Sequence, residues 1–367
     1  MTSIRTSGAG TPAPDDVTLR IMPASGAGAV ALTGWTSVRV TAGIERLPRD
    51  FDIEMTERYP REFAELSVKP GDGVALFIGD DLVITGYVDI YEPSLSGRAH
   101  SIRISGRGKC ADLVDCAAEW PNCQVAGVST LAVARKLAAP YGIAVTSLVA
   151  DRGRPIQKYQ ISYAETAYSV LDRFCRYYGL LAYDGPDGNL ILARGGADRA
   201  ASGIAEGKNL ERGVVTLSMH DRFSEYLAYT LTTNPLTEGR DFPPAAKSVD
   251  SQVPRHRRRV VIAEMGASDS GFPQRRADWE NARRKGRSAQ VRATVDSWRD
   301  GAGRLWTPNT LAPLSLPALK IDRVSWLIGE VTYRRDESGT HADLVLMPPQ
   351  AFQPEPFNLY PVWRDVQ

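Results

Sequence analysis

The sequence predicts a mainly β protein with α+β insertions, in which two small antiparallel β-barrels flank an α+β middle region. Short β-type runs, each ended by a cluster of Gly, Pro, Asn or Asp, recur over residues 17–106 and again over residues 289–349. Between them, residues 107–208 change to a helical spacing of apolar residues. At 367 residues the chain also exceeds what one hydrophobic core usually serves, so several domains are expected.

The N-terminal part is expected to be a flexible arm followed by the first barrel. Residues 1–16 are rich in Gly, Ser, Thr, Ala and Pro and offer little apolar surface to offset the entropy of ordering them. Residues 17–106 form the first β-barrel domain. Apolar and polar residues alternate over 51–55, which is typical of a half-buried strand. A hairpin is expected to turn at Asp80-Asp81.

The middle region, residues 107–208, is expected to be a small α+β domain. Ser129 is a suitable N-cap for a helix that Pro140 stops. A longer helix over 164–178 places its apolar residues on one stripe, and Gly179 caps it. A Gly-rich turn between two apolar runs then predicts a hairpin.

Residues 209–288 are expected to form an inter-barrel region of strands, a loop and a basic helix. The loop is placed at 235–254, which is polar and interrupted by prolines, and the helix at 275–290. The second β-barrel follows at 289–349, and the proline-punctuated residues 350–367 form an extended C-terminal tail.

Within the second barrel no residue looks like a catalyst. No residue-level repeat links it to the first barrel, so any duplication between them would be structural only. Its β-type runs are Val291 with Thr294-Val295, Leu305-Trp306, 324–333 and 342–347.

Basic character is concentrated in one segment. The chain is almost neutral, with 44 basic and 43 acidic residues, yet residues 255–304 hold 13 Lys or Arg against 6 Asp or Glu. An interface with an acidic surface of another subunit ranks first, a solvated face second and nucleic acid third, because the segment lacks interleaved exposed aromatics and a DNA-binding motif. The candidate interface residues are Arg255, Arg257, Arg258, Arg259, Arg275, Arg276, Arg283, Arg284, Lys285 and Arg287.

No cofactor or metal is expected. The four cysteines, Cys110, Cys116, Cys123 and Cys175, fit no zinc spacing with the scattered histidines and are interpreted as reduced, partly buried thiols. The N-terminus lacks an apolar signal core and no apolar run reaches about 18 residues, so no membrane insertion is expected and synthesis is placed in a cytoplasm.

Catalytic interpretations are weaker than structural ones, and the protein is expected not to be an enzyme. The segment SGRGKCAD fails the spacing of a phosphate-binding loop and favours a strand-to-helix turn. The acidic pairs are interpreted as solvated strand and loop faces, rather than as the carboxylates of a glycoside hydrolase. Cys175 is interpreted as a core residue rather than a nucleophile. The tryptophans are interpreted as core or subunit-contact residues rather than a sugar-binding platform. These residues are Asp52 with Glu54, Glu62 with Glu65, and Trp298, Trp306 and Trp326.

Several stretches, in this order, resemble one known family. They read GDGVALFIGDDLVITGYVDIYEP, SIRISGRGKCADLVDCAAEW, ETAYSVLDRFCRYYGLLAYDGPDGNLILA, and DSWRDGAGRLWTPNTLAPL with LIGEVTYRRDESGTHADLVLMPPQAF. Together they resemble the Mu-type contractile-tail baseplate hub protein, the tail protein P family, from about Val17 to Phe352. The helix-Gly-hairpin unit at 165–193 is also similar to units in late-control proteins and type VI secretion spike proteins.

The resemblance implies a homotrimer in which each subunit supplies two similar barrels to a ring of near six-fold symmetry. Such a ring would join a hexameric tail tube to a trimeric central spike and leave a channel for DNA. The implied partners are the chain itself, tail tube protein, central spike protein, other baseplate proteins, and DNA only in transit. The implied location is the virion, after assembly in the host cytoplasm.

Two other functions stay open at this point. One is a spike-related component of a type VI secretion system or a contractile bacteriocin, which shares the fold. The other, from a different class, is a cell-wall-degrading tail enzyme. The hub family has no catalytic or metal residues to carry over.

Overall fold

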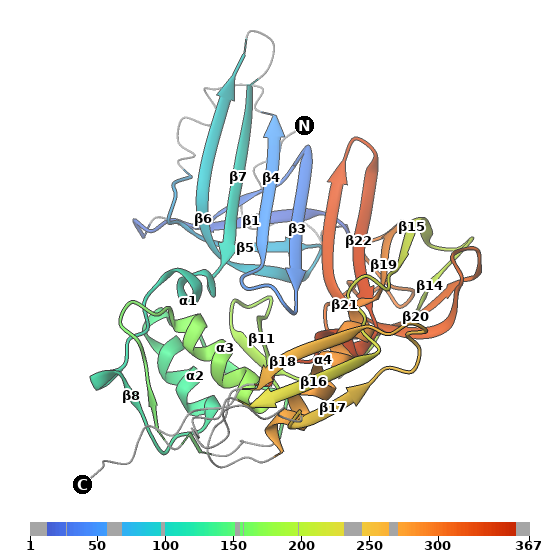
Figure 1. Cartoon of the computed structure of the whole chain (residues 1–367). Coiled ribbons are helices and arrows are strands. Elements are labelled where there is room, and N and C mark those ends of the chain that lie inside the picture. Colours follow the sequence, from blue (N-terminus) through green and yellow to red (C-terminus); the bar gives the residue numbers. More distant parts are fainter. Residues whose placement is uncertain are drawn as a thin grey trace.

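The protein is mainly β, as the sequence predicts, and its longest sheet runs across the molecule (Figure 1). The computed structural model describes residues 13–26, 28–56, 68–96, 100–150, 155–156, 158–196, 198–230, 244–263 and 271–356. In this part of the chain the longest sheet has 14 strands. The strands come from both regions in which the sequence predicts β structure.

The first β unit contains seven strands that pair antiparallel. Its side chains alternate in burial, and Phe51, Ile53 and Met55 all point into the core, as their spacing predicts. The predicted hairpin at Asp80-Asp81 is confirmed. The strands are β1 (Val17–Met22), β2 (Val30–Leu32), β3 (Ser37–Gly43), β4 (Asp50–Thr56), β5 (Gly73–Ile78), β6 (Asp81–Leu95) and β7 (His100–Gly108).

The second β unit draws on residues 198–217 as well as on residues 289–347. Strand β15 pairs with β19, although the two lie far apart in sequence. The strands of the unit are β13 (Asp198–Arg199), β14 (Ile204–Ala205), β15 (Leu210–Leu217), β19 (Ala289–Val295), β20 (Thr310–Leu316), β21 (Ile321–Asp336) and β22 (Gly339–Met347).

One strand expectation in this unit is wrong, and one strand was missed. Leu305 takes part only in an isolated bridge to Arg299, and Trp306 is a buried core residue outside any strand. The strand lies a few residues later, at β20, which contains Pro313, a residue type that disfavours strands. Pro313 is tolerated beside the register irregularity between Leu314 and Ser315, where the ladder is already disrupted.

The two β units are joined by antiparallel pairing between β3 and β21. The register runs from Glu330 opposite Gly43 to Arg335 opposite Val38. One continuous core of buried residues contains side chains from both units. Among the described strands, no pairing connects the first and last strand of either unit, so strand pairing closes no barrel.

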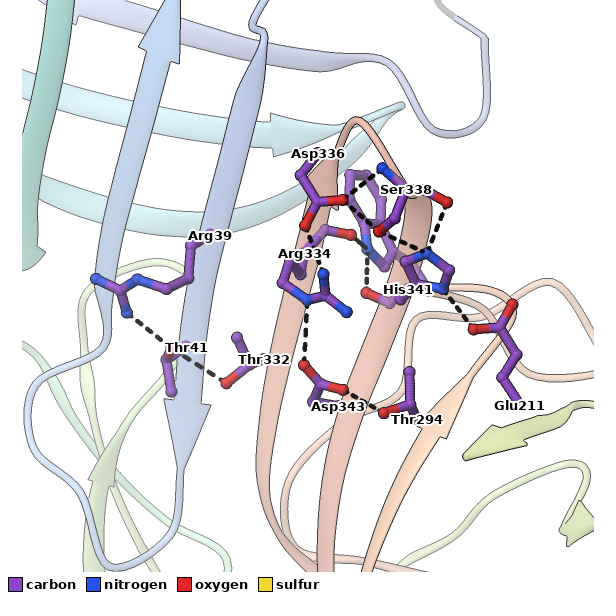
Figure 2. Close-up of polar contacts among 11 residues, drawn as sticks. Arg39, Thr41, Glu211, Thr294, Thr332, Arg334, Asp336, Ser338, His341 and Asp343 are labelled. Atoms are coloured by element: carbon purple, nitrogen blue, oxygen red, sulfur yellow. Dashed lines mark hydrogen bonds and ion pairs between the residues drawn. The ribbon is translucent and has the colours of Figure 1, made fainter. Parts of the chain in front are cut away.

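Polar side chains also meet at this junction, on the sheet face opposite Val40 and Tyr333 (Figure 2). The hydroxyls of Thr41 on β3 and Thr332 on β21 lie 3.2 Å apart. The row continues to β22 and β19, where Thr294 donates to Asp343 at 2.7 Å. The cross-strand ladder is therefore continuous from the first unit into the second.

Arg299 forms a second link between the units. Its guanidinium, mostly buried, lies 2.6 Å from the Asp81 carboxylate and donates to the carbonyl of Pro14 at 2.7 Å. Residues 13–16, expected to belong to a flexible arm, are thus held in place. The rest of that arm lies outside the described residues.

The two β units share one topology. In the first, the order is β3-β4-β7-β6-β5, and in the second it is β15-β19-β22-β21-β20. The register of the β6–β7 hairpin recurs in β21–β22 exactly 240 positions later: Tyr87 opposes Arg107, and Leu327 opposes Met347. Both hairpins also skip one residue, Asp89 and Gly329, at equivalent places. The duplication is structural, without a visible sequence repeat.

The middle region forms an α+β layer below the first unit in Figure 1. Ser129 caps α2 by accepting from the Ala132 N–H, and Gly179 ends α3 with φ 67°, as predicted. The expected helix at 164–178 begins later, at Ala167, because the Thr166 hydroxyl caps it. The elements are α1 (Ala111–Asp115), β8 (Gln124–Val125), α2 (Thr130–Ala138), β9 (Val145–Ser147), β10 (Tyr159–Gln160), α3 (Ala167–Tyr178), β11 (Leu181–Asp184) and β12 (Leu190–Ala193).

A three-stranded sheet packs against the basic helix α4 (Phe272–Arg287). Its strands are β16 (Glu225–Thr230), β17 (Ala246–Val249) and β18 (Arg258–Ala263). Strand β17 corrects the expectation of a loop at 235–254, since its residues pair with β16 despite the flanking prolines. The part of that loop before residue 244 lies outside the described residues. The C-terminal tail starts with a 3-10 turn at Pro349–Phe352, and most of the tail lies outside the described residues.

A buried ion pair docks the middle region onto the first β unit. The Arg49 backbone N–H donates to the Asp184 carboxylate at 2.9 Å, and its guanidinium donates to the Asp184 carbonyl at 2.9 Å. Both residues are almost fully buried. Burial raises the pKa of Asp184, and the charge of Arg49 opposes that rise.

We expect Arg49→Met to lower the free energy of unfolding by about 3–5 kcal/mol at pH 8, because it leaves a buried carboxylate unpaired. The folded-state pKa of Asp184 is raised, so protonation as pH falls removes that charge and the loss should shrink. Denaturant titrations at several pH values measure this. Arg39→Met, at a half-exposed pair with Asp50, is the control and should cost about 0–1 kcal/mol. A loss from Arg49→Met that is independent of pH would contradict this assignment.

Candidate assembly interface

The candidate interface residues lie on β18, on the loop before it and on α4. The two elements converge on the Phe223 ring, where the guanidiniums of Arg257, Arg284 and Arg259 lie 4.9, 5.5 and 5.8 Å from the ring centroid. Arg257 also donates to the carbonyls of Met219 and His220 at 2.6 and 2.7 Å. The basic segment therefore folds onto itself.

Glu280, which is buried on α4, neutralises part of this charge. Its carboxylate accepts from Arg284 at 2.7 Å and lies 3.8 Å from Arg259 and 3.9 Å from Arg276. Arg276 also pairs with Glu355. Arg276 and Arg284 each lie one helical turn from Glu280, whereas Arg259 reaches it from β18, and the local excess of positive charge is correspondingly smaller.

The C-terminal end of α4 clamps the first β unit to the end of the described chain. Arg283 donates to the carbonyls of Ala351 and Gln353, each at 2.9 Å, and pairs with Glu45 at 2.8 Å. Arg287 pairs with the other oxygen of the same carboxylate. A cavity of about 260 Å³ lies beside these groups, but its arginines already face carboxylates of the chain itself.

The remaining candidates differ in how far they are available to a partner. Arg258 pairs with Glu225 at 2.6 Å, and hydrogen bonds from Lys247 and Arg258 lower the pKa of Glu225 to about 2. Arg275 lies over the Phe272 ring at 5.9 Å. Arg255 and Lys285 are exposed and form no ion pair with the part of the chain that the structure describes. These two candidates are therefore the most available to a partner.

Exposed apolar side chains that the sequence did not single out gather elsewhere. One set, Val249, Val260 and Ile262, lies on the sheet formed by β16, β17 and β18, and these three residues are 51–59% exposed. Ile90 and Leu95 on β6, and Val214 and Leu217 on the distant β15, are exposed as well. The sequence does not distinguish these exposed apolar residues from core residues, because an apolar run in a strand has the same pattern whether the protein core or another subunit covers it.

The described residues contain no cluster of potential metal ligands, and none of their helices is long and apolar enough to cross a bilayer. Burial raises the pKa of the Cys110 and Cys175 thiols far above the usual range, consistent with core residues. All four cysteines are unpaired, as predicted. Trp298, Trp306 and Trp326 are buried.

The structure also shows the surroundings of Asp52 on β4 and the conformation of the segment SGRGKCAD. Asp52 is bonded by Arg103 at 2.9 Å, which lowers its pKa, so it faces cations on a strand surface. Strand β7 ends at Gly108 and α1 begins at Ala111, which is a strand-to-helix turn. Glu62 and Glu65 lie outside the described residues.

Three family models match the chain. "Mu phage baseplate assembly protein GpP-like, N-terminal" matches residues 26–108, "Baseplate hub protein gp44-like, second domain" matches 110–194, and "Mu phage baseplate assembly protein GpP, fourth domain" matches 270–355.

Relatives and solved structures agree with these models. Baseplate hub protein gp44 of Escherichia phage Mu is 32% identical over 333 residues, covering 87% of this chain and 86% of the relative. The 43 kDa tail protein of prophage MuSo2 from Shewanella oneidensis has a TM-score of 0.80 at 28% identity, over 94% of this chain and all of that one.

A type VI secretion system component from E. coli has a TM-score of 0.53 at 11% identity, covering 90% of this chain and 76% of its own, which shows a shared fold alone. The identity to the Mu protein extends over most of both chains. This protein therefore belongs to the family of Mu-type baseplate hub proteins.

Proposed function

We propose that this protein is the structural hub of a Mu-like phage baseplate and assembles as a homotrimer. In this role three chains supply six β units to a ring of near six-fold symmetry. The ring joins a hexameric tail tube to a trimeric central spike and leaves a channel through which DNA passes. The protein is then a virion component, assembled in the host cytoplasm together with other baseplate proteins.

The duplicated β unit carries this proposal. A three-fold ring can present six similar contacts to a hexameric tube only if each chain contributes the same element twice. The two units share strand order, hairpin register and the skipped residue, and β3–β21 pairing sets them side by side. Barrel-like closure of each unit within the ring is part of the proposal.

A spike-related role in a type VI secretion system is the second candidate, and the fold shared with the E. coli component favours it. The higher identity to the phage protein places the hub role first. The names of the related proteins describe structural parts of a baseplate, which favours the hub over the cell-wall-degrading enzyme.

We expect the purified protein to form trimers that appear as rings in negative-stain images. Light scattering over a range of concentrations measures the mass, with a peptidoglycan zymogram as a test of the enzyme alternative. A monodisperse monomer at all concentrations would contradict the hub proposal, and clearing of peptidoglycan would favour the enzyme.

The exposed cations allow a separate test of the proposed basic interface. Lys285→Glu should weaken trimer formation about tenfold at low salt and leave the stability of the chain unchanged, because Lys285 forms no ion pair with the described residues. Arg283→Ala should lower the free energy of unfolding by about 1–3 kcal/mol, because it removes two hydrogen bonds to backbone carbonyls and one ion pair with Glu45. Salt-dependent DNA retention that Lys285→Glu abolishes, with an unchanged trimer, would instead favour nucleic acid.

A further inference from the structure

The sheet formed by β16, β17 and β18 has one covered face and one exposed face. Val261 and Ala263 of β18 belong to a core cluster that they share with residues of α4. Because side chains alternate along a strand, Val260 and Ile262 point to the opposite face. These two side chains are 51% and 57% exposed. Helix α4 therefore covers only one side of this sheet.

The exposed face continues across the sheet to β17. Val249 lies opposite Glu225 of β16, and Glu225 lies opposite Arg258 of β18. Residues that lie opposite one another point to the same face, so Val249 shares its face with Val260, two positions after Arg258. Val249 is 59% exposed. Val249, Val260 and Ile262 form an apolar outer face in contact with water, and covering it is favourable.

The end of the described chain runs along α4 toward the start of that helix. The Trp279 indole N–H and the Arg283 guanidinium donate to the Gln353 carbonyl at 2.8 and 2.9 Å. Arg276, nearer the start of the helix, pairs with Glu355. The chain from Gln353 to Glu355 therefore runs antiparallel to α4 and is held at both positions.

This attachment places the last described residues on the β18 side of the helix. The Arg276 guanidinium lies 3.9 Å from the Glu280 carboxylate, and that carboxylate lies 3.8 Å from Arg259 of β18. Strand β18 is an outer strand of the sheet, whose order among the described strands is β17-β16-β18. The chain thus leaves its described part beside the edge of the sheet that carries the outer face.

The residues that follow are apolar for so short a segment. Residues 357–367 read FNLYPVWRDVQ, in which six of eleven are apolar or aromatic. Residues 231–243 and 264–270, which connect strands of the same sheet to the rest of the chain, hold only three of thirteen and two of seven. By composition, residues 357–367 are therefore the segment best suited to an apolar surface.

The length of this segment is sufficient to reach the outer face. Eleven residues span up to about 36 Å. The path from the helix layer, round the edge of the sheet, to its far face is about 15 Å, on the order of five residues. Residues from Val362 onward can therefore lie on the outer face, and Trp363 has the largest apolar surface among them.

We propose that residues 357–367 bind the outer face of the sheet in the same subunit, with Trp363 packed against Val260 and Ile262. The attachment at Glu355 favours the face of its own subunit, because a tether of a few residues gives an effective concentration in the millimolar range. The sheet is then held from both sides, by α4 on one face and by the tail on the other. This inference does not depend on the proposed hub function.

Thiol labelling of the full-length protein tests this contact. Ile262→Cys places a reporter on the outer face and leaves the tail unaltered. A maleimide should react with this thiol about tenfold faster once Trp363→Ala is added, because the bound tail otherwise shields the thiol most of the time. Removal of residues 357–367 should have at least the same effect. Mass spectrometry of the labelled peptide separates residue 262 from the four natural cysteines.

Two matched controls accompany the reporter. Val214→Cys reports on a side chain that is 46% exposed on β15, in the second β unit, and its labelling rate should be the same with and without the tail. Gln367→Ala changes a polar residue of the same segment and should leave the thiol at position 262 as slow as in the parent. Thermal unfolding of each variant shows that a change in labelling does not come from loss of the fold.

A mixing experiment distinguishes the same subunit from a neighbouring one. The Ile262→Cys chain that lacks residues 357–367 is mixed with an excess of the unaltered chain before concentration, and its thiol should stay fast. Slow labelling in the mixture would show that the tail covers a second copy and would overturn the assignment to its own subunit. Equal rates with and without the tail would overturn the contact altogether, whether both are fast, as on an open face, or both slow, as under another cover.

Discussion

Antiparallel pairing between β3 and β21 is the contact on which the rest of the structure depends. It places two β units edge to edge, and the hydrophobic core continues from one into the other. Because side chains in a strand alternate between faces, a slip of one residue would turn Val40 and Tyr333 out of the core. The register of this junction therefore fixes the position of one unit relative to the other.

Other contacts support that arrangement from outside the sheet. Arg299 holds the turn of the first unit against the second, and Arg49 anchors the middle region through Asp184. Helix α4 contacts the first unit through Glu45 and the end of the described chain through the carbonyls of Ala351 and Gln353. These contacts join segments that are far apart in sequence, so each restrains one region of the subunit relative to another.

Local structure was largely predictable from the sequence because its signals are local. Alternation identified β4, and Ser129 and Gly179 identified helix ends, since a cap depends only on residues within a turn. Strand β20 was missed because Pro313 is a strong local signal against a strand, overridden here by pairing on both sides. No local signal indicates that β15 pairs with β19, because the two strands are far apart in sequence.

The candidate interface was less predictable, because charge in a sequence does not show its partners. Most of the arginines between Arg257 and Arg287 are paired with carboxylates or carbonyls of their own chain, Glu280 and Glu45 above all. Lys285 is among the few that stay free among the described residues. The duplication was invisible in the residues themselves and emerges only from strand register, since equivalent positions such as Phe51 and Val291 share burial and not identity.

The central claim is that the β3–β21 junction fixes one β unit against the other, and amide hydrogen exchange tests it most directly. The amides of Val38, Val40 and Ala42 in β3, which face β21, should exchange as slowly as amides in the interior of either unit. Rapid exchange at these three amides, with the neighbouring strands protected, would contradict the account.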